Sequence, residues 1–273
     1  MSEKTSHFIC PVCKGALCEN EKSYVCSNNH TFDKAKSSYV NLLMSNASHS
    51  HGDSKEMVAS RKRFLSSGKY SPLMESAVSI GKKYFTGGNV LDAGAGEGYY
   101  TSHIYNILKQ SGNLEAMYGI DVSKFALIQA TKAEPNVKYA VASIYNLPFK
   151  DNCFSMIFNL FAPLSAEEYA RTLSDEGILI RLVPLENHLI ELKRAIYNTA
   201  YLNDPPENEI DGFALVDYKD IKYSINVEKE MLPDLFAMTP YFRKTSANDS
   251  AKIDSLSDLD ITVHVALQVF IKK

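Results

Sequence analysis

Three glycines at alternating positions, Gly94, Gly96 and Gly98, constrain the fold of this chain more than any other feature. They follow a short apolar, β-biased segment at 89–93 and precede a helical run that begins near Tyr99. Glycine lets the backbone turn sharply and approach a ligand, because no Cβ atom is in the way. A strand, a glycine turn and a helix in this order predict a parallel α/β sheet that binds a ligand at the turn.

A second strand, predicted over 115–121, ends in Asp121 one supersecondary unit later. An acid at this point is suited to hold ribose hydroxyls, so the two segments together predict an adenosyl-type cofactor. The dinucleotide fingerprint G-x-G-x-x-G needs its third glycine at position 99, where this chain has Tyr99. The spacing G-x-G-x-G instead resembles the first motif of S-adenosylmethionine (SAM)-dependent methyltransferases. A purely structural turn is the alternative that the motif alone leaves open.

A separate group of cysteine and histidine residues stands near the amino terminus. Cys10 and Cys13 form one closely spaced pair, and Cys26 and His30 follow as a second pair after twelve intervening residues. Two such pairs on separate turns supply the thiolate and imidazole ligands that tetrahedral zinc requires. A segment this short buries little apolar surface, so we expect the metal to supply its folding energy. Free thiols or a disulfide are the alternative, and Cys18 fits neither pair.

Composition and charge limit the classes of protein to which this chain can belong. With 273 residues and 45% hydrophobic content, the chain fits one large globular domain and a small one. Its polar start and its short apolar stretches predict a cytoplasmic protein without a membrane partner. The net charge is −3, yet residues 1–70 carry ten Lys and Arg against six Asp and Glu. A positive front part suits capture of a polyanion, and a solvated basic surface is the alternative.

The order of predicted elements divides the chain into a zinc module at 1–45, a linker with helices at 46–86 and an α/β domain at 87–273. Ser45 to Ser54 has a linker composition; Ser54 is expected to cap one helix, and Pro72 to open the next. We predict parallel strands at 89–93, 115–121, 137–142, 154–160 and 177–183, and helices at 98–110, 123–133, 166–173 and 186–200. With late strands at 221–227 and 261–272, the fold class is α/β, a Rossmann-like seven-stranded SAM-methyltransferase sheet behind a zinc module.

This arrangement is similar to that of one family, the bacterial 23S rRNA (guanine-N1-)-methyltransferases. The similarity runs nearly end to end, in short segments at 10–13, 24–26, 30–33, 39–43, 52–57, 96–101, 119–124, 147–149, 188–193 and 238–240. The resemblance implies SAM-dependent methylation of N1 of one guanine in a 23S rRNA hairpin, with structural zinc in a module that helps to bind RNA. It further implies rRNA processing, a homodimer as one oligomeric option and, in one branch, macrolide resistance.

The resemblance also implies particular site residues. Zinc ligands are expected at Cys10, Cys13, Cys26 and His30, and SAM contacts at Tyr70, Gly96, Glu97 and His188, with Asp92, Gly94, Gly98 and Asp121 completing the cofactor site. Glu97 heads a helix, where the dipole favours a carboxylate that could take the ligand's ammonium; a helix-capping acid is the alternative. For Tyr70 and His188, the alternative to contact with the cofactor is an ordinary structural role. Residues 143–146 depart from the family pattern where the adenine would pass.

The segment after the fourth strand is the predicted contact with the substrate base. Asn159 could hydrogen-bond the guanine edge and Phe161 could stack on the ring, with a buried apolar role as the alternative for Phe161. No residue is assigned as the base that accepts the N1 proton.

Basic residues of the first helix are the predicted contact with the RNA backbone. Arg61, Lys62 and Arg63 stand together there, with Lys69 just beyond the helix. Two other functions compete with this interpretation: a SAM methyltransferase of a small molecule such as a quinone, and a zinc-dependent RNA-binding protein whose SAM site has decayed.

Overall fold

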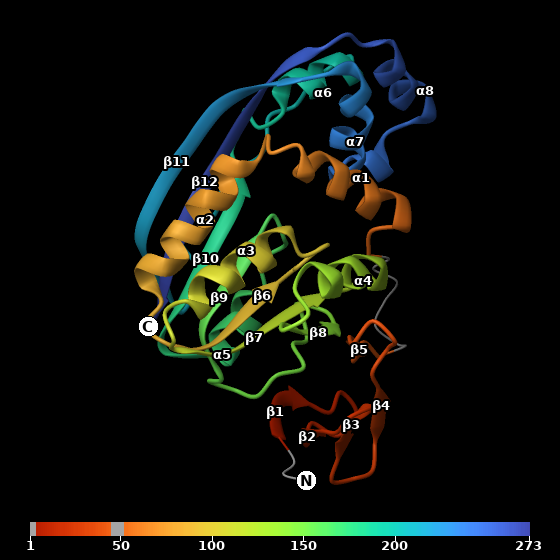
Figure 1. Cartoon of the computed structure of the whole chain (residues 1–273). Coiled ribbons are helices and arrows are strands. Elements are labelled where there is room, and N and C mark those ends of the chain that lie inside the picture. Colours follow the sequence, from red (N-terminus) through yellow and green to blue (C-terminus); the bar gives the residue numbers. More distant parts are fainter. Residues whose placement is uncertain (1–3, 45–51) are drawn as a thin grey trace.

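The computed structural model describes residues 4–44 and 52–273, and a mixed eight-stranded sheet lies at its centre (Figure 1). The order of its strands is β11-β12-β10-β9-β6-β7-β8-β5. They are β5 (Val40–Asn41), β6 (Gly88–Ala93), β7 (Leu114–Asp121), β8 (Lys138–Val141), β9 (Phe154–Leu160), β10 (Leu173–Pro184), β11 (Phe213–Val227) and β12 (Leu259–Lys272). β12 is antiparallel to both of its neighbours, and the pairs from β10 to β5 are parallel. The mixed sheet with its helices confirms the α/β fold class; the strands from β6 to β12 are consistent with the predicted seven, and β5 is an eighth that the sequence did not predict.

The strand order explains where a ligand binds. β6 comes first along the α/β domain, with β7 and β8 on one side of it and β9 and β10 on the other. The direction of winding reverses between β6 and β9, and in open α/β sheets the loops at such a point diverge and leave a crevice at the carboxyl ends of the strands. The glycine turn directly follows β6 and the segment of Phe161 directly follows β9, so both predicted sites flank that crevice.

Helices cover the sheet and extend it at one end. They are α1 (Lys55–Ser66), α2 (Ser71–Tyr84), α3 (Tyr99–Lys109), α4 (Lys124–Ala133), α5 (Ala166–Thr172), α6 (Ile190–Ile196), α7 (Leu232–Ala237) and α8 (Ala247–Ser250), with short 3-10 turns η1 (Lys229–Met231), η2 (Phe242–Lys244) and η3 (Ala251–Ser255). Ser54 caps α1, as predicted, by accepting a hydrogen bond from the N–H of Met57 at 3.2 Å. Figure 1 shows α1, α6, α7 and α8 gathered at the end of the molecule opposite the zinc module.

The predicted helix at 186–200 is wrong at both ends, because α6 begins only at Ile190 and ends at Ile196. The preceding residues pair with β12 instead: the N–H of Leu185 donates to the carbonyl of His264, and the N–H of Leu189 donates to that of Thr262. Leu189 itself has a left-handed backbone with φ of 57°. This long-range pairing has no local signal, so the sequence alone suggested a longer helix.

The amino-terminal module is a small antiparallel sheet of β1 (Lys4–Ile9), β2 (Ala16–Glu19), β3 (Ser23–Cys26) and β4 (Thr31–Asp33). Backbone bonds join β1 to the α/β domain, since the N–H of Ile9 donates to Pro148 and the N–H of Lys150 donates to His7. The module therefore does not stand alone. The predicted boundary between residues 45 and 46, and the linker up to residue 51, lie outside the described residues.

One hydrophobic core crosses from this module into the main sheet. Phe8 is fully buried and stacks on Phe149, with ring centroids 5.0 Å apart, and its ring meets that of Tyr118 edge-on at 5.2 Å. Leu17 and Tyr24 of the module belong to the same buried cluster. The zinc module and the α/β domain thus stabilise each other through shared apolar burial. No helix in the described part of the chain is long and apolar enough to cross a membrane.

This shared core makes Phe8→Ala a test of how the two parts are coupled. We expect the free energy of unfolding in urea to fall by about 3–5 kcal/mol, because a large cavity opens in the shared core. The whole chain should still unfold in one transition. The control Val12→Ala removes a side chain that is 51% exposed, and should change stability by less than about 0.5 kcal/mol. A loss below about 1 kcal/mol for Phe8→Ala would contradict the shared core.

Candidate functional site

The glycine turn has the geometry that its spacing predicted. Gly94, Gly96 and Gly98 have φ angles of 104°, 56° and 89°, which disfavour other residues. A Cβ atom on Gly94 would lie 2.7 Å from the Cβ of Ala162, and one on Gly98 would lie 2.8 Å from the Cα of Ala130. The outer two glycines thus let the turn pack against its neighbours. A Cβ atom on Gly96 would meet Nη1 of Arg61 at 3.8 Å, an ordinary contact, so the middle of the turn is less crowded than its two ends.

Two carboxylates beside the turn each have a buried oxygen that accepts no hydrogen bond from any described residue, although one of these oxygens lies 3.9 Å from Nη1 of Arg61. They are Oδ1 of Asp92 and Oε2 of Glu97. The other oxygen of Asp92 accepts a hydrogen bond from Thr101 Oγ1 at 2.6 Å. Burial raises the pKa of Asp92 to about 7 and also raises the pKa of Glu97. Orphaned acceptors are costly inside a protein, and a cationic ligand such as the ammonium group of SAM is a partner that fits them.

Asp121 joins the turn to the next strand. Its Oδ2 accepts from the backbone N–H of Gly96 at 3.0 Å, and its Oδ1 accepts from that of Ser123 at 2.7 Å. Burial raises the pKa of this carboxyl group. Each carboxylate oxygen has a second lone pair, so both remain able to accept from ribose hydroxyls. The position predicted for ribose binding is therefore compatible with that role.

Aromatic rings from four separate segments meet around Phe161. Phe161 lies over both Tyr70 and His188, with centroid distances of 6.4 Å and 6.1 Å and interplanar angles of 26° and 28°. Tyr100 adds a ring 6.2 Å from Phe161. Phe161 is 37% exposed and has a left-handed φ of 56°, which turns it out of the strand. The sequence did not single out Tyr100, because its contact depends on the approach of β9 to α3.

The hydrogen bonds of His188 define its tautomer. The backbone N–H of His264 donates to its Nδ1 at 3.3 Å, so the hydrogen of the neutral ring is on Nε2, which faces the hydroxyl of Tyr70 at 3.4 Å. Burial lowers the pKa of His188 to about 3. The ring therefore stays neutral and does not repel a sulfonium cation. With His188 as donor, the hydroxyl hydrogen of Tyr70 remains available for a ligand.

The four predicted zinc ligands form one cluster. The ligand atoms of Cys10, Cys13, Cys26 and His30 all lie within 4.8 Å of one another. The sulfurs of Cys13 and Cys26 are 3.6 Å apart, and Nδ1 of His30 is 3.5 Å from the sulfur of Cys10 and 3.4 Å from that of Cys26. Tetrahedral zinc with sulfur at about 2.3 Å would place two thiolates about 3.8 Å apart. A backbone hydrogen bond from Gly15 lowers the pKa of Cys13 to about 6, which favours the thiolate that zinc binds.

The predicted RNA-contacting residues have different surroundings. Arg61 is ion-paired with Asp53, and its Nη1 lies 3.9 Å from Glu97. It therefore belongs to the group of charged residues around the glycine turn, which we call the cofactor corner and which includes Asp92, Glu97 and Asp121. Asp53 is a further member of that corner that the sequence did not identify. Arg63 makes a bidentate pair with Asp234, at 2.8 and 2.5 Å.

Lys69 and Lys62 differ in whether their ammonium charge is already paired within the protein. Lys69 donates to the carbonyl of Asn226 and pairs with Glu228. Lys62 is exposed, and among residues 4–44 and 52–273 its ammonium group donates only to the amide oxygen of Gln129, so its charge is open to a ligand.

Asn159 requires a correction. Its side chain is fully buried, and its amide nitrogen donates to the carbonyl of Pro163 and to the hydroxyl of Tyr169, both at 2.9 Å. Its oxygen faces Arg181 Nε at 3.4 Å. An amide engaged in this way does not reach a guanine. Asn159 instead holds the loop that presents Phe161, and the sequence could not distinguish these two roles.

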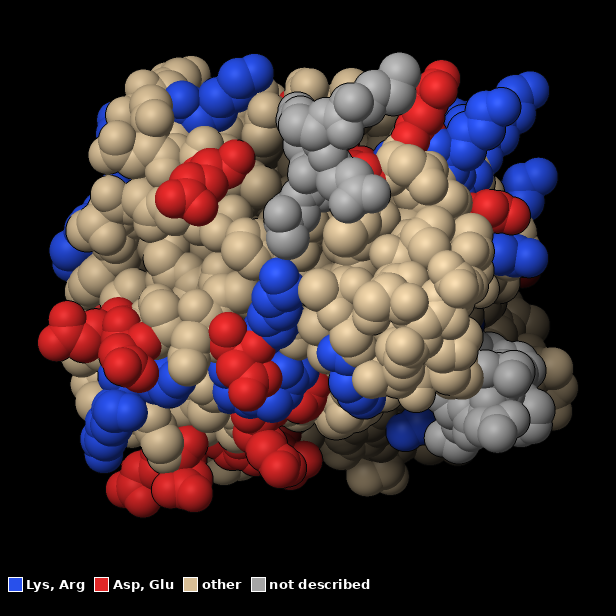
Figure 2. Space-filling model, turned by 90° about the horizontal axis from the view of Figure 1, so that it is seen from below, with Lys and Arg blue, Asp and Glu red and all other residues tan. Residues whose placement is uncertain are grey.

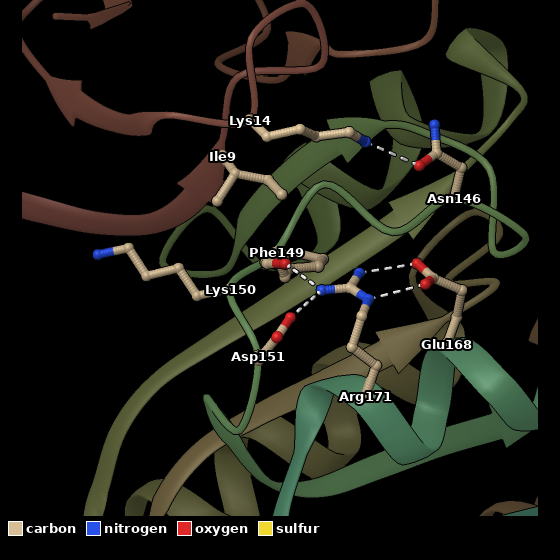
Figure 3. Close-up of a pocket in the computed structure, with 8 residues that line it drawn as sticks. All are labelled: Ile9, Lys14, Asn146, Phe149, Lys150, Asp151, Glu168 and Arg171. Carbon is tan, nitrogen blue, oxygen red and sulfur yellow. Dashed lines mark hydrogen bonds and ion pairs between the residues drawn. The ribbon is translucent and has the colours of Figure 1, made fainter.

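A pocket of about 480 Å³ marks the seam between the zinc module and the α/β domain (Figure 3). On one wall Lys14, next to the ligand Cys13, donates to the side chain of Asn146 at 3.1 Å. On the other, Arg171 is held by Glu168 and Asp151. Lys14 thus connects the zinc cluster to the loop that follows β8, the loop expected to border the adenine.

The face of the molecule at the zinc end carries charges of both signs. Figure 2 shows Lys and Arg scattered among Asp, Glu and wide uncharged areas rather than gathered in one continuous positive patch. An RNA-binding surface is therefore not evident from charge on this face alone.

Comparison with known proteins agrees with this geometry. Residues 8–51 match the zinc-ribbon family described as RlmA, N-terminal, and residues 90–176 match the methyltransferase domain family. A 23S rRNA (guanine(748)-N(1))-methyltransferase of Streptomyces fradiae is 31% identical over 243 residues, which cover 86% of this chain and 85% of the relative. YxjB of Bacillus subtilis, named provisionally as a 23S rRNA (guanine-N(1)-)-methyltransferase, is 28% identical over 98% of both chains. The solved structure of the YcgJ protein from Bacillus subtilis has a TM-score of 0.50 at 17% identity, covers 73% of this chain and 99% of that chain, and supports the fold alone.

The sheet, the glycine turn with its carboxylates and the Cys3His cluster define a SAM-dependent methyltransferase with an amino-terminal zinc ribbon. Within this class, the extent of identity to the Streptomyces relative is decisive. The chain belongs to the 23S rRNA (guanine-N1-)-methyltransferase family.

The zinc cluster can be tested by exchanging single cysteines. Cys13→Ser removes one ligand of the cluster, so the purified protein should lose most of its zinc in metal analysis and melt at a lower temperature. Cys18→Ser is the matched control, because Cys18 is in the same module but outside the cluster. It should keep the zinc content of the unaltered protein. Full zinc retention by Cys13→Ser would show that the cluster is not the metal site.

The pKa of Asp92 predicts a pH dependence of cofactor binding. Ionisation of this buried carboxyl group near pH 7 creates the charge that attracts a cation, so SAM affinity measured by calorimetry should increase from pH 6 to pH 8. Binding at pH 6.5 should release a proton. Because burial raises the pKa of Asp92 on folding from 3.8 to about 7, its contribution lowers the stability of the protein as the pH rises from about 4 to about 7, and the full cost is present at pH 8. Asp92→Asn should therefore bind SAM more weakly and with less pH dependence, yet be at least as stable at pH 8; an unchanged pH profile would contradict this role.

Proposed function

We propose that this protein transfers the methyl group of SAM to N1 of a specific guanine in a 23S rRNA hairpin. The observation that carries the proposal is the joint presence of a glycine turn with orphaned carboxylates and a Cys3His cluster in one shared fold. The Streptomyces relative, whose name states this activity, aligns with 86% of the chain, and YxjB of Bacillus subtilis aligns with 98% of it, which spans both parts.

The residues of the crevice would bind SAM as follows. Gly96 leaves space for the cofactor, Asp121 accepts from the ribose, and Asp92 with Glu97 receives the ammonium group. Tyr70, fixed by His188, offers its hydroxyl hydrogen. SAM supplies an electrophilic methyl group on its sulfonium, and the protein's contribution is to hold donor and acceptor in line.

Phe161 is the residue we assign to the target guanine. Its partly exposed ring at the mouth of the crevice can stack on a base that has left its helix. N1 of guanine must lose its proton during the reaction. His188 does not accept it in the tautomer inferred from its hydrogen bonds, because Nε2 then carries a hydrogen and Nδ1 is occupied by the N–H of His264.

The zinc ribbon acts structurally in this proposal. Four protein ligands leave no open position on the metal for substrate or water. By closing the loops of β1 to β4, zinc would hold Lys14 and the seam against the loop that borders the cofactor. Because the module shares its core with the α/β domain, its removal should disturb the whole enzyme and not only RNA capture.

The competing function, methylation of a small molecule, lacks comparable support. The zinc ribbon matches the RlmA-type amino-terminal family, and three relatives at 28–32% identity are named for 23S rRNA. A cytoplasmic location, a homodimer and resistance to macrolides remain proposals that follow from the family.

The activity can be tested on rRNA directly. Reverse transcription of 23S rRNA should stop next to one guanine in cells that contain this protein and not in cells that lack it, because an N1 methyl group blocks Watson–Crick pairing. Purified protein with labelled SAM should modify the same base in unmodified rRNA. Phe161→Ala should lower the rate by at least about tenfold, since stacking on the base is lost, while SAM affinity is retained. Transfer of label to a metabolite extract but not to rRNA would overturn the proposal.

A further inference from the structure

A groove of about 730 Å³ lies between α1 and α4, outside the cofactor corner. Its floor is apolar and includes Val58 and Ile128, and Phe125 stands at its edge with 37% of its surface exposed. Lys55 and Lys62 line the same groove. Among the described residues that line it, none is acidic. The groove thus combines apolar and aromatic surface with positive charge.

Two lysines line this groove, and a third, Lys124, stands beside it next to Phe125. Lys55 and Lys62 are on α1, and Lys124 begins α4 with its Nζ 5.3 Å from the ring centroid of Phe125. None of the three is ion-paired within the described part of the chain, although Lys62 donates to Gln129 at 3.0 Å. Arg63 also lines the groove, but Asp234 neutralises it. An aromatic ring beside cations that are not ion-paired is suited to bind a nucleotide, because the base can stack on the ring and the phosphate can pair with the ammonium groups.

The position of the groove connects it to the reacting centre. α1 carries Arg61 on its inner side, against Glu97 and close to Gly96, while the groove is on its outer side. α4 begins three residues after Asp121. The same two helices therefore border the cofactor corner and the groove.

We infer that this groove binds the RNA substrate beside the target base, with an unpaired nucleotide on Phe125 and its flanking phosphates on Lys55, Lys62 and Lys124. The inference rests on the proposed function and adds to it the surface that holds the RNA. A second copy of the chain is a poorer occupant, because a two-fold contact through this patch would bring its unpaired lysines close to those of the partner. RNA is the occupant with complementary charge.

The experiment measures binding of a fluorescent 23S rRNA transcript by anisotropy over a range of KCl concentrations. The transcript is one that the unaltered protein has first been shown to methylate, so a failure of the proposed function is recognised before any variant is compared. Lys55→Gln with Lys62→Gln should weaken binding and lower the slope of log affinity against log salt by about two, one for each phosphate contact. Phe125→Ala should weaken binding by about tenfold with little change in slope.

The matched controls are on the opposite edge of the sheet. Lys219→Gln with Lys222→Gln removes two exposed charges from β11, and Tyr218→Ala removes an aromatic ring that is 43% exposed there. Both should bind RNA as the unaltered protein does, and all variants should keep their SAM affinity. Unchanged RNA affinity and salt slope in the groove variants would overturn the inference. So would a change in sedimentation without a change in RNA affinity, since it would identify the groove as a contact between copies.

Discussion

The structure depends on how it accommodates three carboxylates in one buried corner. Asp92, Glu97 and Asp121 surround the glycine turn, and the protein supplies too few donors for all of their oxygens. Burying acids in this way is unfavourable, which is why burial raises the pKa of each group. The corner has Arg61 as a nearby cation, with its Nη1 3.9 Å from Glu97, and a cationic cofactor adds further compensation. The buried carboxylates lower the stability of the ligand-free protein, and the same groups contribute affinity when a cationic ligand binds.

The zinc module contributes to the same corner from the other end of the molecule. Its metal cluster organises loops that could not fold alone, and Phe8 anchors them to Phe149 in the main core. From the zinc ligand Cys13, the chain reaches Lys14 and, through it, Asn146 in the loop after β8. We therefore expect loss of the metal to disturb the loop expected to border the adenine, because the zinc module and the α/β domain share one core.

Local patterns predicted most of the fold and part of the site. The cap at Ser54, the glycine turn and the zinc pairs depend on residues close in sequence, and the structure has each of them in place. The predictions that needed correction involve distant partners. The start of α6 was misplaced because the chain before it pairs with β12, and Asn159 was given to the substrate because nothing local reveals its bonds to Pro163 and Tyr169.

The sequence by itself determined the class of chemistry, because glycine spacing at 94–98 and ligand spacing at 10–30 are requirements of short backbone segments around a cofactor and a metal. Only the tertiary structure decided which polar groups remain available. It engaged Arg61 with acids, buried Asn159 and left Lys62 unpaired in the groove between α1 and α4. The reason is physical. The type of a side chain sets which groups it can bind, but whether its donors, acceptors and charge remain unused depends on neighbours that the fold brings from far along the chain.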